Sequence, residues 1–204
     1  MTWTPKPDTK GHQPQANKIS PFKASKYEQA SLSNLTLDEW DAEVIFNWLK
    51  NPTDIFFIYS TPGTGKTYLT AAIIHHYMHK NIPCLYLKEK DFINKLREQI
   101  NDGFSEEQYL KYMCENSMIV LDDICSSRTN SPDASEGKMT DWHKDMLFTF
   151  LDYRVNSRLP TIITSNYSLD DLGKMFHPRF ISRLKATNNT ILHLKGTDKR
   201  QEGL

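Results

Sequence analysis

The stretch that decides the fold runs from Ile55 to Thr67 and reads Ile55-Phe56-Phe57-Ile58-Tyr59-Ser60-Thr61-Pro62-Gly63-Thr64-Gly65-Lys66-Thr67. Its first five residues are apolar or aromatic, which is typical of a buried strand. A glycine-containing loop follows, and apolar residues then recur at helical spacing over residues 66–80. A strand, a glycine loop and a helix in this order predict a phosphate-binding loop (P-loop), whose backbone N–H groups and helix N-terminus face the anion.

The residues of this loop have distinct expected roles. Lys66 is expected to reach the β- and γ-phosphates of ATP, and the Thr67 hydroxyl to ligate Mg²⁺. The other candidates for nucleotide contact are Pro62, Gly63, Thr64, Gly65 and Tyr68. Ser60 departs from the full pattern, which has glycine there. A serine adopts a glycine-only backbone angle at a cost, so we expect the loop to start slightly differently and to bind nucleotide less tightly.

Two more apolar runs end in polar residues. Residues 118–121 are followed by Asp122 and Asp123. We expect Asp122 to hold Mg²⁺ through its water shell and Asp123 to polarise the attacking water. Asp123 is one methylene shorter than glutamate, which predicts slow turnover. A third run, residues 161–164, leads to Asn166, which would point at the γ-phosphate or its water.

The bulk properties allow one α/β domain. The chain has 204 residues, 38% of them hydrophobic and 25% charged, and its formal net charge is zero. Neutral charge argues against a protein that coats nucleic acid through bulk electrostatics. No apolar run approaches the roughly 18 residues of a membrane span, and the N-terminus lacks a signal-peptide core. The sequence therefore indicates a cytoplasmic protein with no membrane partner.

The cysteines and a group of histidines are candidate metal ligands that the sequence does not favour. Cys84, Cys114 and Cys125 show no CxxC spacing and are expected to be buried or unpaired thiols. Of the three histidines at 75, 76 and 79, only the first and last stand one helical turn apart, and no carboxylate completes a site. We expect surface histidines.

The chain divides near residue 34. Residues 1–34 are rich in proline and lysine and are predicted to be a flexible basic tail; residues 35–204 form the ATPase domain. Thr36 or Asp38 is expected to cap a first helix that Asn51-Pro52 ends. Further strands are predicted over residues 84–87, 118–121, 161–164 and 191–194. Further helices are predicted over residues 89–101, 105–115, 142–155, 169–175 and 178–185. Residues 126–138 are predicted to be a mobile loop.

With these motifs, the chain from about Leu35 onward resembles the DnaC/DnaI helicase loaders and their relatives, the IstB transposition ATPases, within the AAA+ class. The resemblance is carried by Thr64-Gly65-Lys66-Thr67-Tyr68-Leu69, Asp122-Asp123-Ile124, Asp152-Tyr153-Arg154, Leu159-Pro160-Thr161-Ile162-Ile163-Thr164-Ser165-Asn166 and Arg179-Phe180-Ile181-Ser182-Arg183-Leu184. It implies a P-loop fold of the ASCE type: a three-layer α/β sandwich whose parallel sheet has five strands. The strand that ends at Asn166 would lie between the two Walker strands, and the C-terminal helical lid would be essentially absent.

The resemblance also implies roles for basic residues. An arginine from a neighbouring subunit would reach ATP, with Arg183 favoured over Arg179. Arg200 looks like the family's late sensor-2 arginine. The helix at residues 89–101 falls where these proteins contact single-stranded DNA, and the candidate DNA-binding residues are Lys88, Lys90, Lys95 and Arg97.

The function expected from these features is Mg²⁺-dependent, slow ATP hydrolysis. The protein would load or remodel a replicative DnaB-type helicase on single-stranded DNA and form a homo-oligomer when ATP is bound. The alternatives are an IstB-like ATPase that partners a transposase, a small-molecule phosphotransferase, and a nucleotide-binding module that does not hydrolyse ATP. Residues 1–34 are shorter than the N-terminal domains with which loaders grip their helicase.

Overall fold

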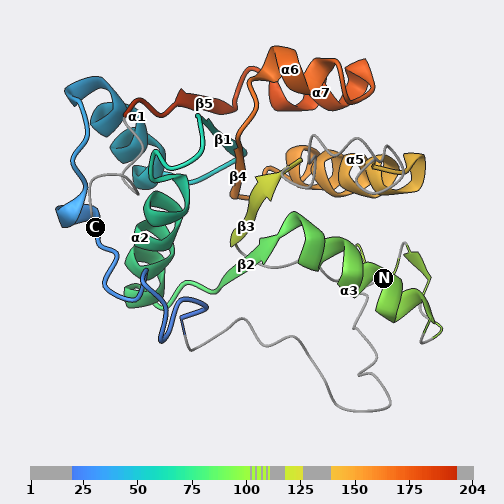
Figure 1. The fold of residues 1–204 in the computed structure, drawn as a ribbon, viewed down its shortest axis with the longest axis horizontal. Coiled ribbons are helices and arrows are strands. Elements are labelled where there is room, and N and C mark those ends of the chain that lie inside the picture. The colour runs from blue at the N-terminus through green and yellow to red at the C-terminus, as the bar shows by residue number, and fades with distance from the viewer. Residues whose placement is uncertain are drawn as a thin grey trace.

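A five-stranded parallel sheet forms the centre of the molecule (Figure 1). The computed structural model describes residues 20–101, 103, 105, 106, 108, 110, 118–125 and 139–196. The strands are β1 (Ile55–Tyr59), β2 (Cys84–Lys88), β3 (Met118–Ile124), β4 (Thr161–Ser165) and β5 (Thr190–His193). They lie in the order β2-β3-β4-β1-β5, and every neighbouring pair is parallel. The prediction that the strand before Asn166 lies between the two Walker strands is confirmed.

Helices follow the strands as the alternating pattern predicts. They are α1 (Glu39–Lys50), α2 (Lys66–His79), α3 (Glu89–Asn101), α5 (Asp141–Asn156), α6 (Leu169–Gly173) and α7 (Pro178–Leu184), preceded by the short 3-10 helix η1 (Leu32–Asn34). Asp38, rather than Thr36, caps α1: its carboxylate accepts the backbone N–H of Asp41 at 2.7 Å. Within the described residues, no helix combines the length and apolar character that crossing a bilayer requires.

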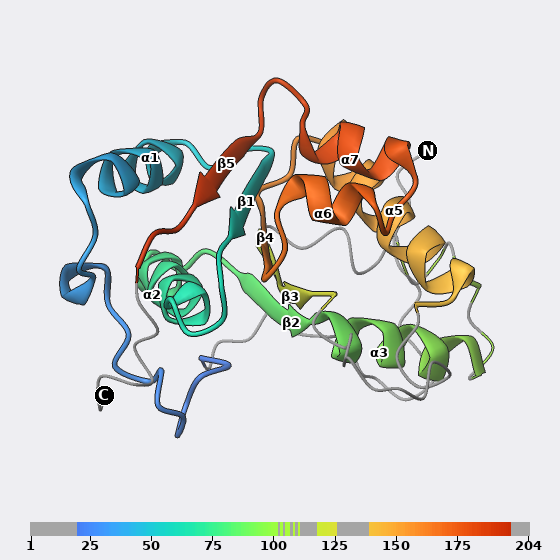
Figure 2. The same cartoon turned by 45° about the horizontal axis from the view of Figure 1, so that its top comes forward.

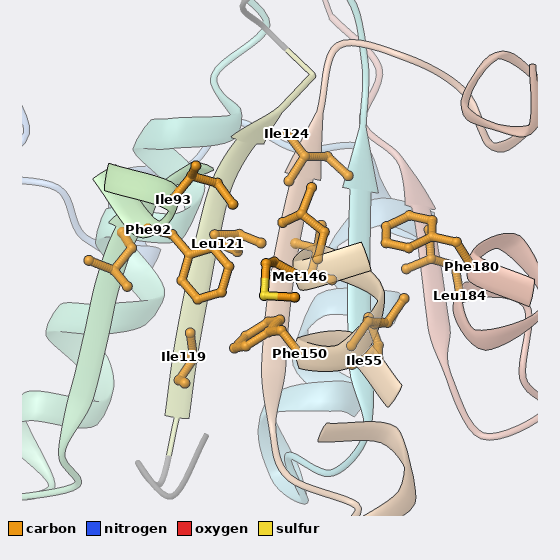
Figure 3. Packing of buried hydrophobic residues seen from close by; sticks show 14 of the residues in the cluster. Ile55, Phe92, Ile93, Ile119, Leu121, Ile124, Met146, Phe150, Phe180 and Leu184 are labelled. Carbon is orange, nitrogen blue, oxygen red and sulfur yellow. The ribbon is translucent and has the colours of Figure 1, made fainter. Parts of the chain in front are cut away.

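The helices cover both faces of the sheet and make three layers (Figure 2). Alternate strand residues point to opposite faces, so Phe57 joins the core beneath α3 and α5 while Phe56 and Ile58 join the core beneath α1 and α2. Figure 3 shows Phe92 and Phe150 from the first core against the sheet; their rings meet edge to face with centroids 5.2 Å apart. The predicted three-layer α/β fold is confirmed.

The N-terminal boundary of the domain differs from the prediction. Residues 20–34 were expected to belong to a flexible tail, but Phe22 and Ala30 are each 4% exposed and pack into the core beneath α1 and α2. His75 of α2 anchors this segment, with its ring nitrogens 2.7 Å from Ser20 Oγ and 2.8 Å from the Ala30 carbonyl oxygen. The segment is polar on average, so its composition does not indicate that Phe22 is buried. The burial of Phe22 helps to hold the segment against the domain. Residues 1–19 lie outside the described residues.

Other differences are local. Trp40, an aromatic residue in the first turn of α1, is 54% exposed. Strand β3 does not end before the aspartate pair but continues through it to Ile124. Cys84 and Cys125 are buried, as expected. Cys114, the predicted loop at 126–138 and most of the predicted helix at 105–115 lie outside the described residues, although residues 106, 108 and 110 are helical.

Candidate nucleotide and magnesium site

The P-loop joins β1 to α2 at the carboxyl end of the sheet. Gly63 and Gly65 have φ angles of 87° and 100°, a left-handed conformation that glycine adopts without strain, and Gly65 caps α2. Lys66 is buried, and its Nζ donates to the carbonyl oxygens of Ser60 and Thr61 at 2.8 and 2.9 Å. The loop therefore places a cation and the N-terminus of a 14-residue helix side by side, which suits a phosphate group.

Ser60 occupies its position without backbone strain. It is buried, and its φ angle is not among the positive ones in the described chain. Its N–H donates to the carbonyl oxygen of Ser165 at 3.2 Å, which continues the β1–β4 ladder by one residue. A glycine is therefore not needed here, and the expected loss of affinity has no cause in strain at Ser60.

Asp122 is the most strongly hydrogen-bonded acid of the site. The residue is 2% exposed, and three hydroxyl groups donate to its carboxylate. Thr164 Oγ1 lies 2.6 Å from Oδ1, while Tyr86 Oη and Thr67 Oγ1 lie 2.7 and 3.2 Å from Oδ2. The three donors come from α2, β2 and β4, so the carboxylate is held from three elements.

The donor set of this site fits magnesium. The Thr67 hydroxyl and the Asp122 carboxylate are hard oxygen ligands 3.2 Å apart at the start of α2. Mg²⁺ in nucleotide sites is held by one or two such protein oxygens, with phosphate and water completing its shell. No larger group of His, Cys, Asp and Glu that could cage a metal occurs in the described part of the chain. Bound there, Mg²⁺ would neutralise charge on the phosphates.

Asp123 and Asn166 lie together next to Asp122. The amide Nδ2 of Asn166 donates to Asp123 Oδ1 at 2.8 Å, and the Asp123 N–H donates to Thr164 Oγ1 at 2.8 Å. Asp123 has φ 61°, and the β3–β4 register shifts between Leu121 and Ile124. This irregularity lets two consecutive strand residues serve the same site, since a regular strand would point them to opposite faces.

The predicted arginines are not brought to this site within the chain. Arg183 forms an ion pair with Asp152 of α5. Arg179 is exposed, and among the described residues no acid pairs with it. Both residues lie on α7, so each would have to act on a neighbouring subunit. Arg200 lies outside the described residues.

The predicted DNA-binding residues lie on and before α3, and Lys88, at the end of β2, is the register partner of Asp122 in β3. Lys88, Lys90, Lys95 and Arg97 are all exposed. The guanidinium of Arg97 lies over the Trp142 ring, 5.4 Å from its centroid. Exposed basic side chains with a nearby aromatic ring are compatible with nucleic-acid contact, which stays a prediction.

Two residues of the site, Thr164 and Tyr86, were not predicted from the sequence. Thr164 was noted only as part of the strand before Asn166, although a polar residue inside an otherwise apolar run is a usable signal. Tyr86 gave no such signal, because it lies in the middle of β2, two residues before the strand ends. Its role depends on the pairing of β2 with β3, which a single sequence does not reveal.

Comparison with known proteins agrees with this geometry. The family model for the "ATPase family associated with various cellular activities (AAA)" matches residues 56–188. The chain is 29% identical over 121 residues to the replicative helicase loader DnaI of Bacillus subtilis, covering 59% of this chain and 35% of DnaI. It is 27% identical over 135 residues to the replicative helicase loader DnaC of Escherichia coli, covering 65% of this chain and 51% of DnaC.

The solved structures show the same fold. A crystal structure of the DnaC helicase loader superposes with a TM-score of 0.67 and 26% identity, covering 83% of this chain and 98% of that one. DnaA from Aquifex aeolicus bound to AMPPCP, a nucleotide analogue, superposes with a TM-score of 0.65 over 84% of this chain and 52% of that one; at 18% identity, it shows the fold alone. The matched regions span only about a third to a half of the two curated loaders. The chain belongs to the AAA family of ATPases and is related to the DnaC and DnaI helicase loaders.

Proposed function

We propose that this chain binds ATP with Mg²⁺, hydrolyses it slowly, and uses it to load or remodel a DnaB-type replicative helicase on single-stranded DNA in the cytoplasm. The observation that carries the proposal is that each of the two aspartates is hydrogen-bonded by a polar residue, one at the P-loop and one directly after β4. Asp122 accepts from Thr67 and Asp123 accepts from Asn166. These contacts gather phosphate-binding, metal-binding and water-polarising groups at one end of the sheet.

The residues divide the chemistry among them. Lys66 and the N-terminus of α2 bind the β- and γ-phosphates, while Thr67 and Asp122 hold the metal. Asp123 orients the attacking water and accepts its proton, and the amide of Asn166 fixes the Asp123 carboxylate. Arg183 or Arg179 of a neighbouring subunit would add a further positive charge at the γ-phosphate.

Slow turnover follows from the position of Asp123. Its backbone is in the left-handed conformation, and its carboxylate is already held at 2.8 Å by Asn166. Because an aspartate side chain is one methylene shorter than glutamate, it reaches less far towards a water at the γ-phosphate. A slow ATPase suits a switch whose bound and hydrolysed states must each last long enough to be read by a partner.

The partner and the DNA are argued from relatives and from surface chemistry. Both curated relatives are named replicative helicase loaders, and the AAA family model covers residues 56–188, which include Lys66, Asp122 and Asn166. The exposed basic residues on and before α3 offer positive charge for phosphate contacts. The ATP-dependent homo-oligomer follows from the need for an arginine in trans.

The test is co-elution of the full-length protein with the replicative helicase of its own organism. The loader function is supported by a complex that forms or changes with ATP and Mg²⁺. In Lys66→Ala this complex should be absent or should no longer change with nucleotide. ATP hydrolysis that Lys66→Ala also removes excludes a module that only binds nucleotide. No complex in either nucleotide condition contradicts the loader function and directs attention to a transposase as the partner.

A further inference from the structure

The hydroxyl of Tyr86 takes part in the nucleotide site although it belongs to neither the P-loop nor the two Walker strand ends. Tyr86 lies on β2, at the edge of the sheet, and donates to Asp122 Oδ2 at 2.7 Å. This contact is shorter than the 3.2 Å between the same oxygen and Thr67 Oγ1. The two donors, one from α2 and one from β2, therefore meet at one carboxylate oxygen.

We propose that Tyr86 is a positioning residue that orients the magnesium-binding carboxylate of Asp122. This inference rests on the nucleotide site proposed above. A carboxylate can rotate about its Cβ–Cγ bond, and the direction of its oxygens then decides how well it binds a metal. Thr164 fixes Oδ1 and Tyr86 fixes Oδ2, so both oxygens are held before any ligand binds. Groups that hydrogen-bond a metal-binding carboxylate commonly change metal affinity by about 10- to 100-fold.

The phenol hydroxyl of Tyr86 can act as a hydrogen-bond donor to the Asp122 carboxylate. A neutral phenol donates a hydrogen bond to the carboxylate and carries no positive charge that would replace the metal ion there.

The N-terminal segment holds the Tyr86 ring in place. Phe22 packs against it edge to face, with ring centroids 4.7 Å apart and an interplanar angle of 60°. Phe22 itself is 4% exposed and lies in the segment that His75 fastens to α2. Residues 20–30 thus support the side chain that orients Asp122.

The experiment compares Tyr86→Phe with Tyr77→Phe. Tyr86→Phe keeps the ring against Phe22 and removes only the hydroxyl. Tyr77 is the control, since it is a buried tyrosine whose hydroxyl donates to the Leu49 carbonyl oxygen at 3.0 Å rather than to Asp122. Binding of a fluorescent ATP analogue is titrated with Mg²⁺ and also measured in EDTA, and the melting temperature of each variant is recorded.

The half-saturating Mg²⁺ concentration is expected to rise about tenfold in Tyr86→Phe, with binding in EDTA unchanged. In Tyr77→Phe the Mg²⁺ titration is expected to match the wild type even if the melting temperature falls. An unchanged titration in Tyr86→Phe, or an equal shift in Tyr77→Phe, overturns the proposal. If the protein does not bind a helicase, only the loader function is contradicted, since the Mg²⁺ titration needs neither the helicase nor hydrolysis. If nucleotide binding by the wild type does not depend on Mg²⁺, the roles of both Asp122 and Tyr86 are contradicted.

Discussion

The two ends of strand β4 carry the same residue type in opposite settings. Thr161 begins the strand and Thr164 stands one residue before its end, and both are fully buried. Thr161 Oγ1 accepts from the guanidinium Nε of Arg154 at 2.7 Å and donates to the Leu159 carbonyl oxygen at 2.9 Å. Thr164 Oγ1 donates to Asp122 at 2.6 Å instead. Thr161 therefore hydrogen-bonds a buried cation, Arg154, and Thr164 hydrogen-bonds a buried anion, Asp122.

At the amino end, the residues that Arg154 contacts are close to it in sequence. At the carboxyl end, the residues that hydrogen-bond Asp122 are far from it in sequence. Arg154 is seven residues from Thr161 and six from Pro160, whose carbonyl oxygen it also contacts. Asp122 is 36, 42 and 55 residues from the three hydroxyl groups that donate to it. The contacts of Arg154 at the amino end are thus local, although the Asp54–Arg158 ion pair at the same end joins residues 104 apart. The carboxyl end comes together only when four strands and the P-loop are assembled, as expected of a binding site.

The largest effect that would test this contrast is expected from Asp122→Asn. The substitution keeps the shape of the side chain but removes its charge, so Mg²⁺-dependent hydrolysis should fall about 1000-fold, which corresponds to roughly 4 kcal/mol of transition-state stabilisation. Steady-state ATPase rates at saturating Mg²⁺ measure it.

Asp54→Asn is the matched control at the amino end. Asp54 is also buried, and its carboxylate pairs with Arg158 at 3.1 Å. Its φ of 60° is one that asparagine tolerates, so the backbone should be kept. This variant should lower stability and leave the ATPase rate unchanged. Comparable ATPase losses in the two variants would contradict the division between the ends of the sheet.

A smaller effect is expected from replacing each threonine of β4 with valine. Thr164→Val leaves Asp122 Oδ1 and the Asp123 N–H without their hydroxyl partner, so the half-saturating Mg²⁺ concentration should rise about tenfold. Thr161→Val leaves the Arg154 Nε donor unsatisfied and should cost about 1–3 kcal/mol of unfolding free energy. Urea denaturation and Mg²⁺ titration of nucleotide binding, applied to both variants, measure the two effects. A Thr161→Val protein with altered Mg²⁺ dependence would show that the two ends are coupled.

The same distinction explains what the sequence could predict. Local patterns fix each element, and the boundaries of α2, α3 and β1 follow their apolar spacing and the glycine loop closely. Motif residues such as Lys66 and Asp122 could be recognised because the chemistry of phosphate and magnesium demands those residue types. Their order along the chain, together with the family resemblance, predicted that β4 lies between β1 and β3.

Contacts between distant residues could not be predicted in this way. Tyr86 looks like any aromatic residue of a strand until β2 is paired with β3. Phe22 was hidden in a polar, proline-rich segment because composition averages over one buried ring. The β-bulge at Asp123 depends on hydrogen bonds from β4, so the sequence placed the aspartates after the strand rather than within it.

The smallest effect concerns the amino end at alkaline pH. Cys84 begins β2, and burial raises the pKa of its thiol from 9.0 to about 12. The unfolded chain therefore releases this proton at lower pH than the folded protein does, and the contribution to stability is complete below pH 9 and is lost as the pH rises from about 9 to 12. At about pH 9.5 the wild type should have lost about 1 kcal/mol through this thiol relative to neutral pH. Cys84→Ala, although less stable at neutral pH, should lack this part of the decline. Urea denaturation of both proteins at intervals from neutral pH to about pH 9.5 measures their unfolding free energies, which should converge as the pH rises. Curves that stay parallel would show that Cys84 does not contribute to the loss of stability at alkaline pH.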